Sequence, residues 1–140
     1  MKEILFIDGA LSPSWINELI NENAKRLTTG AYTIFCGQVR ADEEETQIVK
    51  GIEYVIYESM AQKILIEQIQ NLKEQFQIQQ IYVLHSKGFV PVGALSVILF
   101  VTSSHRKQAL LAQEALLPII KFEVPIWKKE IFQNLYSRWT

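Results

Sequence analysis

The sequence predicts an α+β fold in which helices pack on one face of an antiparallel or mixed sheet. Apolar residues recur at alternate positions in some stretches and every three to four positions in others, which gives the order β-α-β-β-α-β-β-α followed by a tail. The strands come in adjacent pairs between helices, whereas a doubly wound nucleotide-binding fold alternates single strands with helices. The chain also lacks the GxGxxG, P-loop, HExxH and GxSxG motifs. We therefore expect residues 1–140 to form a single α+β domain.

Composition and charge narrow the function classes. Apolar residues make up 49% and charged residues 21% of the 140 positions, as in an ordinary globular protein with a buried core. The net charge of -1 gives no reason to expect nucleic acid or an anionic membrane as a partner. A single cysteine, Cys36, excludes an intrachain disulfide and a cysteine-based metal cluster, and it favours a cytoplasmic location. No apolar run is as long as a membrane span, and the first residues have too short an apolar core for a signal peptide.

The first predicted elements are a short apolar strand at residues 4–7 and a helix over residues 13–26. Ser12 is the expected N-cap of this helix and Pro13 its first residue. Its apolar stripe consists of Trp15, Ile16, Leu19 and Ile20.

A second strand is predicted over residues 31–40, where side chains alternate between two faces. Gly37 within it indicates a bulge or a close approach by another group. Cys36 is expected to be a small buried hydrophobe. Arg40 ends the strand, and its guanidinium suits a carboxylate or phosphate, although an edge arginine in solvent is the alternative.

The middle of the chain predicts a strand at residues 48–57 and a helix over residues 58–75. The apolar stripe of this helix consists of Met60, Ile64, Leu65, Ile69, Leu72 and Phe76. A further strand at residues 78–84 leads into a loop with two turn signals over residues 85–93. Residues 95–102 are almost continuously apolar, which predicts a strand buried on both faces.

The last predicted helix begins with a run of cations. Ser104 is the expected N-cap, so His105, Arg106 and Lys107 would occupy the first turn. Cations there oppose the helix macrodipole, whereas the free backbone N–H groups attract an anion. We therefore predict an anion site at this helix start, the alternative being that all three side chains point to water.

The C-terminal stretch places two lysines seven residues apart around a proline. Pro118 is expected to kink the preceding helix and re-aim Lys121, and Pro125 forces the chain out of helical geometry. A short segment anchored by Trp127 would then bring Lys121 and Lys128 together at one pocket. Ordinary surface lysines are the alternative interpretation.

These cations come from a strand end, a helix start and a helix exit. If they converge, they form a pocket for an anionic ligand in a nearly neutral protein. The candidates are Arg40, His105, Arg106, Lys121, Lys128 and Lys129. No set of side chains suggests a metal site.

Four segments carry a resemblance to a known family. They are Phe35-Cys-Gly-Gln-Val-Arg40, Tyr57-Glu-Ser-Met-Ala61, Ser104-His-Arg106 and, the most specific, Lys121 with Val124-Pro-Ile-Trp-Lys-Lys-Glu130 three residues on. In this order and at these spacings they resemble the large, catalytic subunit of molybdopterin synthase, the MoaE family, over about residues 30–139.

The resemblance implies an α/β-hammerhead fold and a homodimer that binds a small ubiquitin-like subunit at each end, giving a heterotetramer. The small subunit carries sulfur as a thiocarboxylate on its C-terminal Gly-Gly, and this tail enters a pocket of the large subunit. Two rounds of sulfur transfer to cyclic pyranopterin monophosphate yield the dithiolene of molybdopterin. The implied activity is that of a sulfurtransferase in molybdenum cofactor biosynthesis, with no cofactor or metal of its own.

The resemblance also implies roles for individual residues. Lys121 and Lys128 would be catalytic, with Lys121 nearest the thiocarboxylate. The implied substrate-binding residues are Gln38, Val39, Arg40, His105, Arg106, Lys121, Lys128, Lys129 and Glu130.

The chain departs from the family pattern at several positions. The family's His-Arg-x-Gly reads His85-Ser-Lys-Gly88 here, Ala94 stands where an acidic residue is common, and Pro118 is unusual. None of these departures removes a residue expected to be catalytic. Two other classes of function stay open, namely a non-catalytic module that docks a ubiquitin-like tail or an anionic phospholigand, and a purely structural dimer.

Overall fold

The computed structural model describes residues 1–44, 47–133 and 137–140. In chain order the elements are β1 (Ile4–Asp8), α1 (Ser14–Asn23), β2 (Ala31–Gln38), β3 (Glu43–Glu44), β4 (Gln47–Ile56), α2 (Glu58–Phe76), β5 (Gln80–Pro91), β6 (Leu95–Ser103), α3 (Arg106–Pro118), the π-helical turn η1 (Ile119–Glu123), β7 (Ile126–Phe132) and β8 (Ser137–Trp139). Within these residues no helix is both long enough and apolar enough to cross a membrane.

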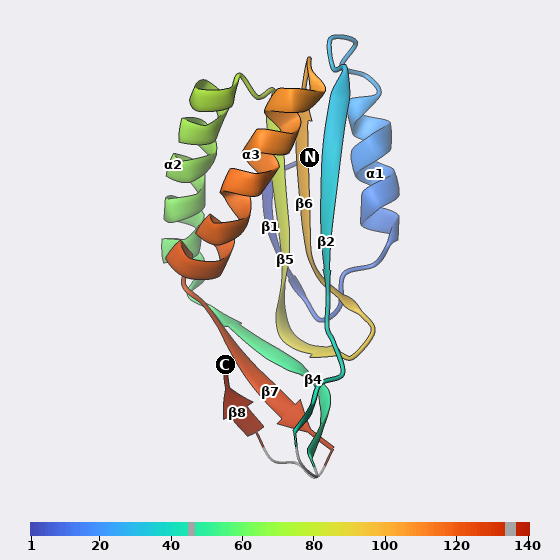
Figure 1. Cartoon of the computed structure of the whole chain (residues 1–140), viewed down its shortest axis with the longest axis vertical. Helices are drawn as coiled ribbons and strands as arrows, with labels where there is room; N and C mark the ends of the chain where they lie inside the picture. Colours follow the sequence, from blue (N-terminus) through green and yellow to red (C-terminus); the bar gives the residue numbers. More distant parts are fainter. Residues whose placement is uncertain (45–46, 134–136) are drawn as a thin grey trace.

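The long strand β5 joins two parts of one sheet (Figure 1). Its first half pairs with β6, which pairs with β2 in turn, and β1 runs parallel to β5. Its second half pairs with β4, and β7 and β8 follow in order. The β1–β5 pair is parallel and the other pairs are antiparallel, so the predicted mixed α+β fold is confirmed.

The predicted loop over residues 85–93 is wrong for most of its length. Strand β5 continues to Pro91, and only Val92 and Gly93 form the turn towards β6. Gly88 has a φ of 80°, a conformation that is open mainly to glycine, so the strand can change direction and partner there without ending. Of the two turn signals, only the one at Gly93 marks a turn between strands.

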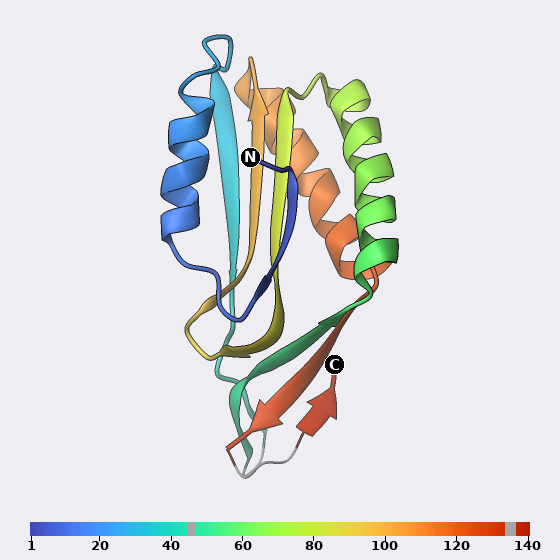
Figure 2. The ribbon, with the colours of Figure 1, turned by 180° about the vertical axis from the view of Figure 1, so that it is seen from behind.

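Helices cover both faces of the sheet, whereas the sequence suggested one face (Figures 1 and 2). Helices α2 and α3 pack on the face that carries Val83 and Leu99. Helix α1 packs its buried Leu19 on the opposite face, against Leu84 and Phe100. Because helices lie on both sides, β6 is almost entirely buried, as its apolar run predicted.

Two apolar positions are more exposed than the sequence pattern suggested. Strand β2 lies at an edge of the sheet, where the helices cover it only partly, and Cys36 is exposed there. Met60, in the first turn of α2, is also exposed. Periodicity identified the elements correctly but not how far the neighbouring elements extend over them.

The C-terminal tail forms strands rather than a segment anchored by Trp127. Strand β7 pairs with β4, and β8 pairs with β7. Trp127 is 51% exposed, so its predicted anchoring role is wrong. Val124 and Phe132, which are buried, fix the two ends of β7 instead.

Pro118 stands where α3 gives way to the π-turn η1. Proline has no N–H group and cannot extend the regular α-helical bonding pattern. The turn Ile119–Glu123 is closed by the Val124 N–H, which donates to the Ile119 carbonyl five residues earlier at 3.1 Å. A π-turn rotates the residues within it relative to a regular helix, which agrees with the expected re-aiming of Lys121.

Candidate functional site

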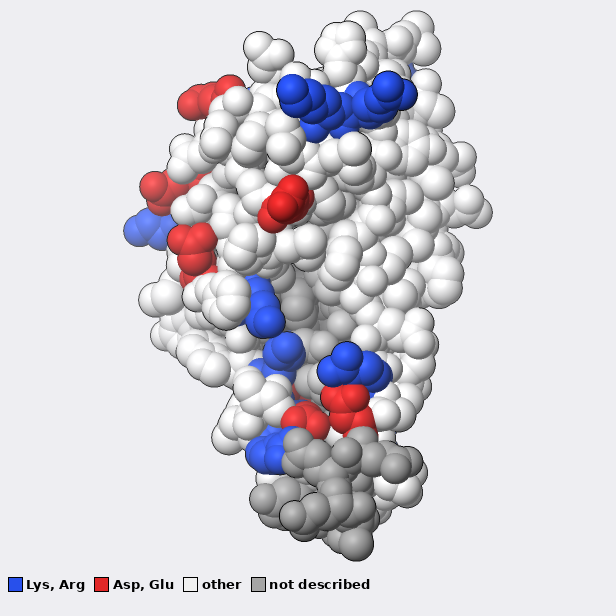
Figure 3. All heavy atoms as spheres, in the orientation of Figure 1, with Lys and Arg blue, Asp and Glu red and all other residues white. Residues whose placement is uncertain are grey.

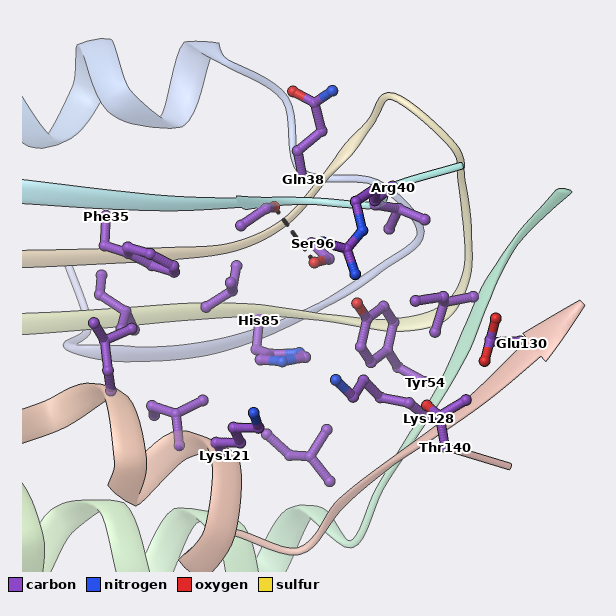
Figure 4. A pocket seen from close by; sticks show the side chains of 18 of the residues that line it. Phe35, Gln38, Arg40, Tyr54, His85, Ser96, Lys121, Lys128, Glu130 and Thr140 are labelled. Carbon is purple, nitrogen blue, oxygen red and sulfur yellow. Dashed lines mark hydrogen bonds between the residues drawn. The ribbon is translucent and has the colours of Figure 1, made fainter. Parts of the chain in front are cut away.

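A cavity of about 720 Å³ opens where the two parts of the sheet meet, below the end of α3 (Figure 4). Its walls are largely apolar and include Phe35, Val97, Leu99, Leu117 and Ile126. The polar and charged residues that line it are Gln38, Arg40, Asp42, Tyr54, His85, Ser96, Lys121, Lys128, Glu130 and Thr140. A concave, mainly apolar space of this volume with a few polar groups is typical of a small-molecule site.

Strand β2 reaches the cavity through a bulge between Gly37 and Gln38. A Cβ atom on residue 37 would clash with Cγ1 of Val97, so the close approach predicted at this glycine is confirmed. Val39 is buried in a small apolar cluster, and its N–H donates to the Ala94 carbonyl at 3.0 Å. Gln38 lines the cavity, but its side chain points away from the lysines (Figure 4).

The Arg40 guanidinium forms an ion pair that the sequence did not predict. Its Nε lies 2.7 Å from Oδ1 of Asp42, and its NH2 group donates to Oδ2 of the same carboxylate at 3.2 Å. Both side chains are largely exposed. An anionic ligand that binds Arg40 therefore competes with Asp42 for the guanidinium.

The two lysines expected to be catalytic both point into this cavity. Lys121 comes from η1, and its Nζ lies 5.3 Å from the ring centroid of the exposed Phe122. Lys128 comes from β7 and enters from the other side (Figure 4). The π-turn and the antiparallel strand thus bring together two amines that are seven residues apart, as the sequence predicted.

Alternation along β7 separates the next two predicted residues. Glu130 lies on the same face as Lys128, lines the cavity and accepts a hydrogen bond from the Arg138 NH2 group at 2.9 Å. Lys129 points to the opposite face, where its Nζ lies 5.0 Å from the ring centroid of Trp139. The expectation that Lys129 completes the wall of the pocket is therefore wrong for this chain.

His105 and Arg106 do not reach this cavity. They lie at the start of α3, whereas the cavity lies below its end, and the 13 residues of the helix span roughly 20 Å. The N-cap position is His105 rather than Ser104, and no side chain caps the helix. The predicted convergence thus holds for Arg40, Lys121 and Lys128 but fails for His105 and Arg106 within one chain.

Figure 3 shows most of the basic side chains on this face of the molecule gathered in two places. One group lies over the start of α3, and the other surrounds the hollow below the end of this helix, next to acidic side chains. Among the described residues no cluster of three or more His, Cys, Asp or Glu side chains is suited to hold a metal ion.

The floor of the cavity contains polar groups that sequence reasoning missed. His85 is only 5% exposed, and its ring lies edge-on to Tyr54, with the two ring centroids 5.0 Å apart. The pKa of His85 is lowered to about 4, chiefly by burial and to a smaller extent by the charge of nearby Lys128, against the opposing effect of the hydrogen bond to the Ser86 carbonyl. Burial also raises the pKa of Tyr54, which the Ser96 hydroxyl beside it partly offsets. The sequence signals for His85 were its position at the end of an apolar strand segment and its place in His85-Ser-Lys-Gly88, which matches the family's His-Arg-x-Gly only in part.

Comparison with known proteins gives matches over most of the chain. The sequence model of the family described as MoaE protein matches residues 9–123. The molybdopterin synthase catalytic subunit of Bos taurus is 34% identical over 110 residues, which are 79% of this chain and 58% of that protein. The chain spans a little over half the length of the mammalian relatives that it matches.

Solved structures give the same result for the fold. The crystal structure of molybdopterin synthase from Staphylococcus aureus is 30% identical, with a TM-score of 0.84 over 100% of this chain and 98% of that chain. A complex of subunits 1 and 2 of the molybdopterin-converting factor from Helicobacter pylori contains a chain that is 25% identical, with a TM-score of 0.84 over 99% of this chain and 90% of that one.

Proposed function

This chain belongs to the MoaE protein family, and on that premise we propose that it is the large, catalytic subunit of a molybdopterin synthase. It would transfer sulfur from the C-terminal thiocarboxylate of a small ubiquitin-like subunit to cyclic pyranopterin monophosphate. The two-subunit complex from Helicobacter pylori supports such a partner for this chain. Residues 1–140 would act as one domain, and the single cysteine favours the cytoplasm as its location.

One observation carries this proposal. The end of β2, the turn η1 and strand β7 bring Arg40, Lys121 and Lys128 to a single cavity with apolar walls. Both proposed reactants are anionic, one at its phosphate and the other at its thiocarboxylate. Fixed cations in a partly desolvated cavity favour the binding of such groups and stabilise the negative charge that develops during transfer.

The proposed roles follow from position. Lys121, in the turn below α3, would act next to the thiocarboxylate, and Lys128 would stabilise the developing charge or move a proton. Arg40 would bind the phosphate after release from Asp42. Glu130 accepts a hydrogen bond from Arg138 and lies on the same face of β7 as Lys128, so it would limit the movement of the Lys128 side chain.

His105 and Arg106 require a second copy of the chain in this proposal. They lie at the far end of α3 from the cavity of their own chain. In a homodimer, the start of α3 from one copy would bring both cations to the cavity of the other. The proposed heterotetramer then contains two sites, each built from two large subunits and one small subunit.

The deciding experiment is reconstitution of the reaction. Purified chain is mixed with thiocarboxylated small subunit and cyclic pyranopterin monophosphate, and molybdopterin is measured. Lys121→Ala should lower product formation by at least about 100-fold, because it removes a charge that acts on the reacting atoms. Lys63→Ala, which changes an exposed lysine of α2, is the matched control and should leave the rate unchanged.

The complex with the small subunit should survive Lys121→Ala, as measured by size-exclusion chromatography. Absence of product with the unaltered chain would refute the proposed activity. Binding of the small subunit without any transfer would instead favour a non-catalytic docking module.

A further inference from the structure

His85 is the most buried ionisable side chain that lines the cavity, and the roles proposed above do not use it. It projects from the middle of β5, where this strand passes from one part of the sheet to the other. Figure 4 shows its ring at the centre of the cavity, between Tyr54 and Lys121 and beside the Lys128 amine. Any ligand that fills the cavity to its floor therefore meets this ring.

A backbone hydrogen bond fixes which ring nitrogen of His85 carries the proton. Nδ1 lies 2.8 Å from the Ser86 carbonyl oxygen, and a carbonyl can only accept, so Nδ1 is the N–H group. In the uncharged ring Nε2 then holds a lone pair and is a hydrogen-bond acceptor. Among the described residues, no donor bonds to Nε2.

We propose that the floor of the cavity is a subsite for the ring of a heterocyclic substrate, with His85 Nε2 accepting a hydrogen bond from an N–H or NH2 group of that ring. In a cavity with largely apolar walls, a hydrogen bond from a ligand donor to this nitrogen would contribute to binding. The ring stays uncharged at neutral pH because burial lowers the pKa of His85 to about 4. The inference rests on the proposed function for the identity of the ring, a pterin.

The arrangement of charge in the cavity supports this orientation of the substrate. Apart from the amines of Lys121 and Lys128, the polar groups close to His85 are the neutral hydroxyls of Tyr54 and Ser96, and the nearby walls are apolar. Arg40 is largely exposed and lies towards the mouth, where a phosphate keeps part of its hydration. A ligand with a neutral hydrogen-bonding ring and an anionic end therefore matches the cavity when its ring points inwards.

Among the described residues, Lys128 is the competing donor whose charge acts on His85. Its charge lies close enough to His85 to lower the pKa of the imidazole, and an ammonium group can donate to Nε2. If Lys128 donated to Nε2 permanently, His85 would position the lysine and would not bind the substrate. These two arrangements predict different changes in the NMR signal of Nε2 when a heterocyclic ligand is added.

The first test is nitrogen NMR of the chain with ¹⁵N-labelled histidine. The chain has two histidines, and His85→Gln assigns the signals by removing one set. We expect Nδ1 of His85 to carry the proton and the Nε2 signal to shift when pterin, the uncharged parent ring, is added. A proton on Nε2, or an Nε2 signal that moves on Lys128→Ala but not with pterin, overturns the proposal.

The second test compares ligands by equilibrium titration. His85→Phe keeps an aromatic ring but removes the acceptor, and it should weaken pterin binding about 5- to 100-fold. His85→Gln can place Oε1 near the position of Nε2 and should restore most of the affinity. The affinity for inorganic phosphate, which needs only the cations, should change less than about twofold in both variants. The control Lys63→Ala should leave the affinity for both ligands unchanged.

The outcomes separate this subsite from the proposed activity. Equal pterin binding by the unaltered chain and His85→Phe, or no pterin binding by the unaltered chain, refutes the subsite. If His85→Phe weakens pterin binding and the unaltered chain makes no molybdopterin, the subsite stands and the proposed activity fails. If His85→Phe makes molybdopterin with the unaltered KM, the activity stands and the subsite fails.

Discussion

Protonation of His85, at the floor of the cavity, makes the stability of the folded state depend on pH. The pKa of the folded-state imidazole is lowered to about 4, against about 6.5 in an unfolded chain. Above pH 6.5 both states are uncharged, and the group adds no pH dependence. As the pH falls from 6.5 to 4, the unfolded chain takes up a proton first, so the folded state loses stability.

We expect this loss to be about 3 kcal/mol between pH 7 and pH 4. Urea unfolding at several pH values measures it, and His85→Gln should flatten the curve by that amount relative to the unaltered chain. Carboxylates also titrate in this range, but they are common to both proteins and cancel in the comparison. Curves that run parallel would show that His85 is not buried in its neutral form.

Asp42 limits the use of Arg40 as an anion-binding residue. The ion pair is short, at 2.7 Å, but both side chains are largely exposed, so it contributes little to stability. Asp42→Asn removes a negative charge from the cavity mouth and should tighten inorganic phosphate binding about two- to fivefold, most strongly at low salt. Asp8→Asn, which changes an exposed carboxylate at the end of β1, is the control for net charge. Weaker phosphate binding by Asp42→Asn would mean that Asp42 holds Arg40 in place for the ligand.

At the scale of single elements, the π-turn η1 sets the direction of Lys121. Pro118→Ala restores an N–H group and allows the α-helix to continue past residue 118. We expect stability to stay the same or to rise by up to about 1 kcal/mol, while molybdopterin formation falls about tenfold because Lys121 turns away from the cavity. Thermal unfolding and the reconstituted reaction measure the two effects, and Pro13→Ala at the start of α1 is the control. A variant that is less stable and fully active would contradict this role for the π-turn.

The type and burial of some elements could be predicted from the sequence, whereas other elements were missed. The apolar run of β6 predicted its type and its burial, and the stripe of α2 predicted its type and most of its covered face, because local periodicity follows directly from the face that is covered. The second half of β5 was missed because Gly88 signals a turn whether or not the strand continues beyond it. Strand β7 was missed because its partners in β4, such as Val49 for Phe132, are far away in the sequence and leave no local pattern.

At the scale of the whole molecule, the candidate site was predictable only in part. Arg40, Lys121 and Lys128 could be named because a strand end and a helix exit can turn cations towards one pocket, and because these residues match the family's motifs. His85 and Tyr54 could not, since an apolar strand with one polar residue does not show which face that residue occupies. The placement of His105 and Arg106 depends on the length of α3 and, in the proposed dimer, on a second copy of the chain, which the sequence of one chain does not place.

The proposed shared site predicts complementation between two inactive variants. Lys121→Ala damages the cavity of its own chain, whereas Arg106→Ala would damage the cavity of its partner. A mixture in equal amounts that exchanges subunits at random is half heterodimer, and each heterodimer has one intact site of two. We therefore expect about a quarter of the unaltered activity from two variants that are each almost inactive. No recovery after complete exchange, checked with differently tagged chains, would place all the essential groups in one chain.

Because both parts of the sheet share β5, the pairing of this strand also affects where the sheet can open locally. Strand β5 joins β4 through four residue pairs, whereas it joins β6 through six. The short seam lies between the wall that carries Lys128 and the wall that carries Arg40. Local opening there would break fewer ladder bonds than unfolding either part, so we expect the distance between the two walls to be the first to vary on warming. Strand β5 would then be the hinge between the two walls, and the same strand carries the residues at the floor of the cavity.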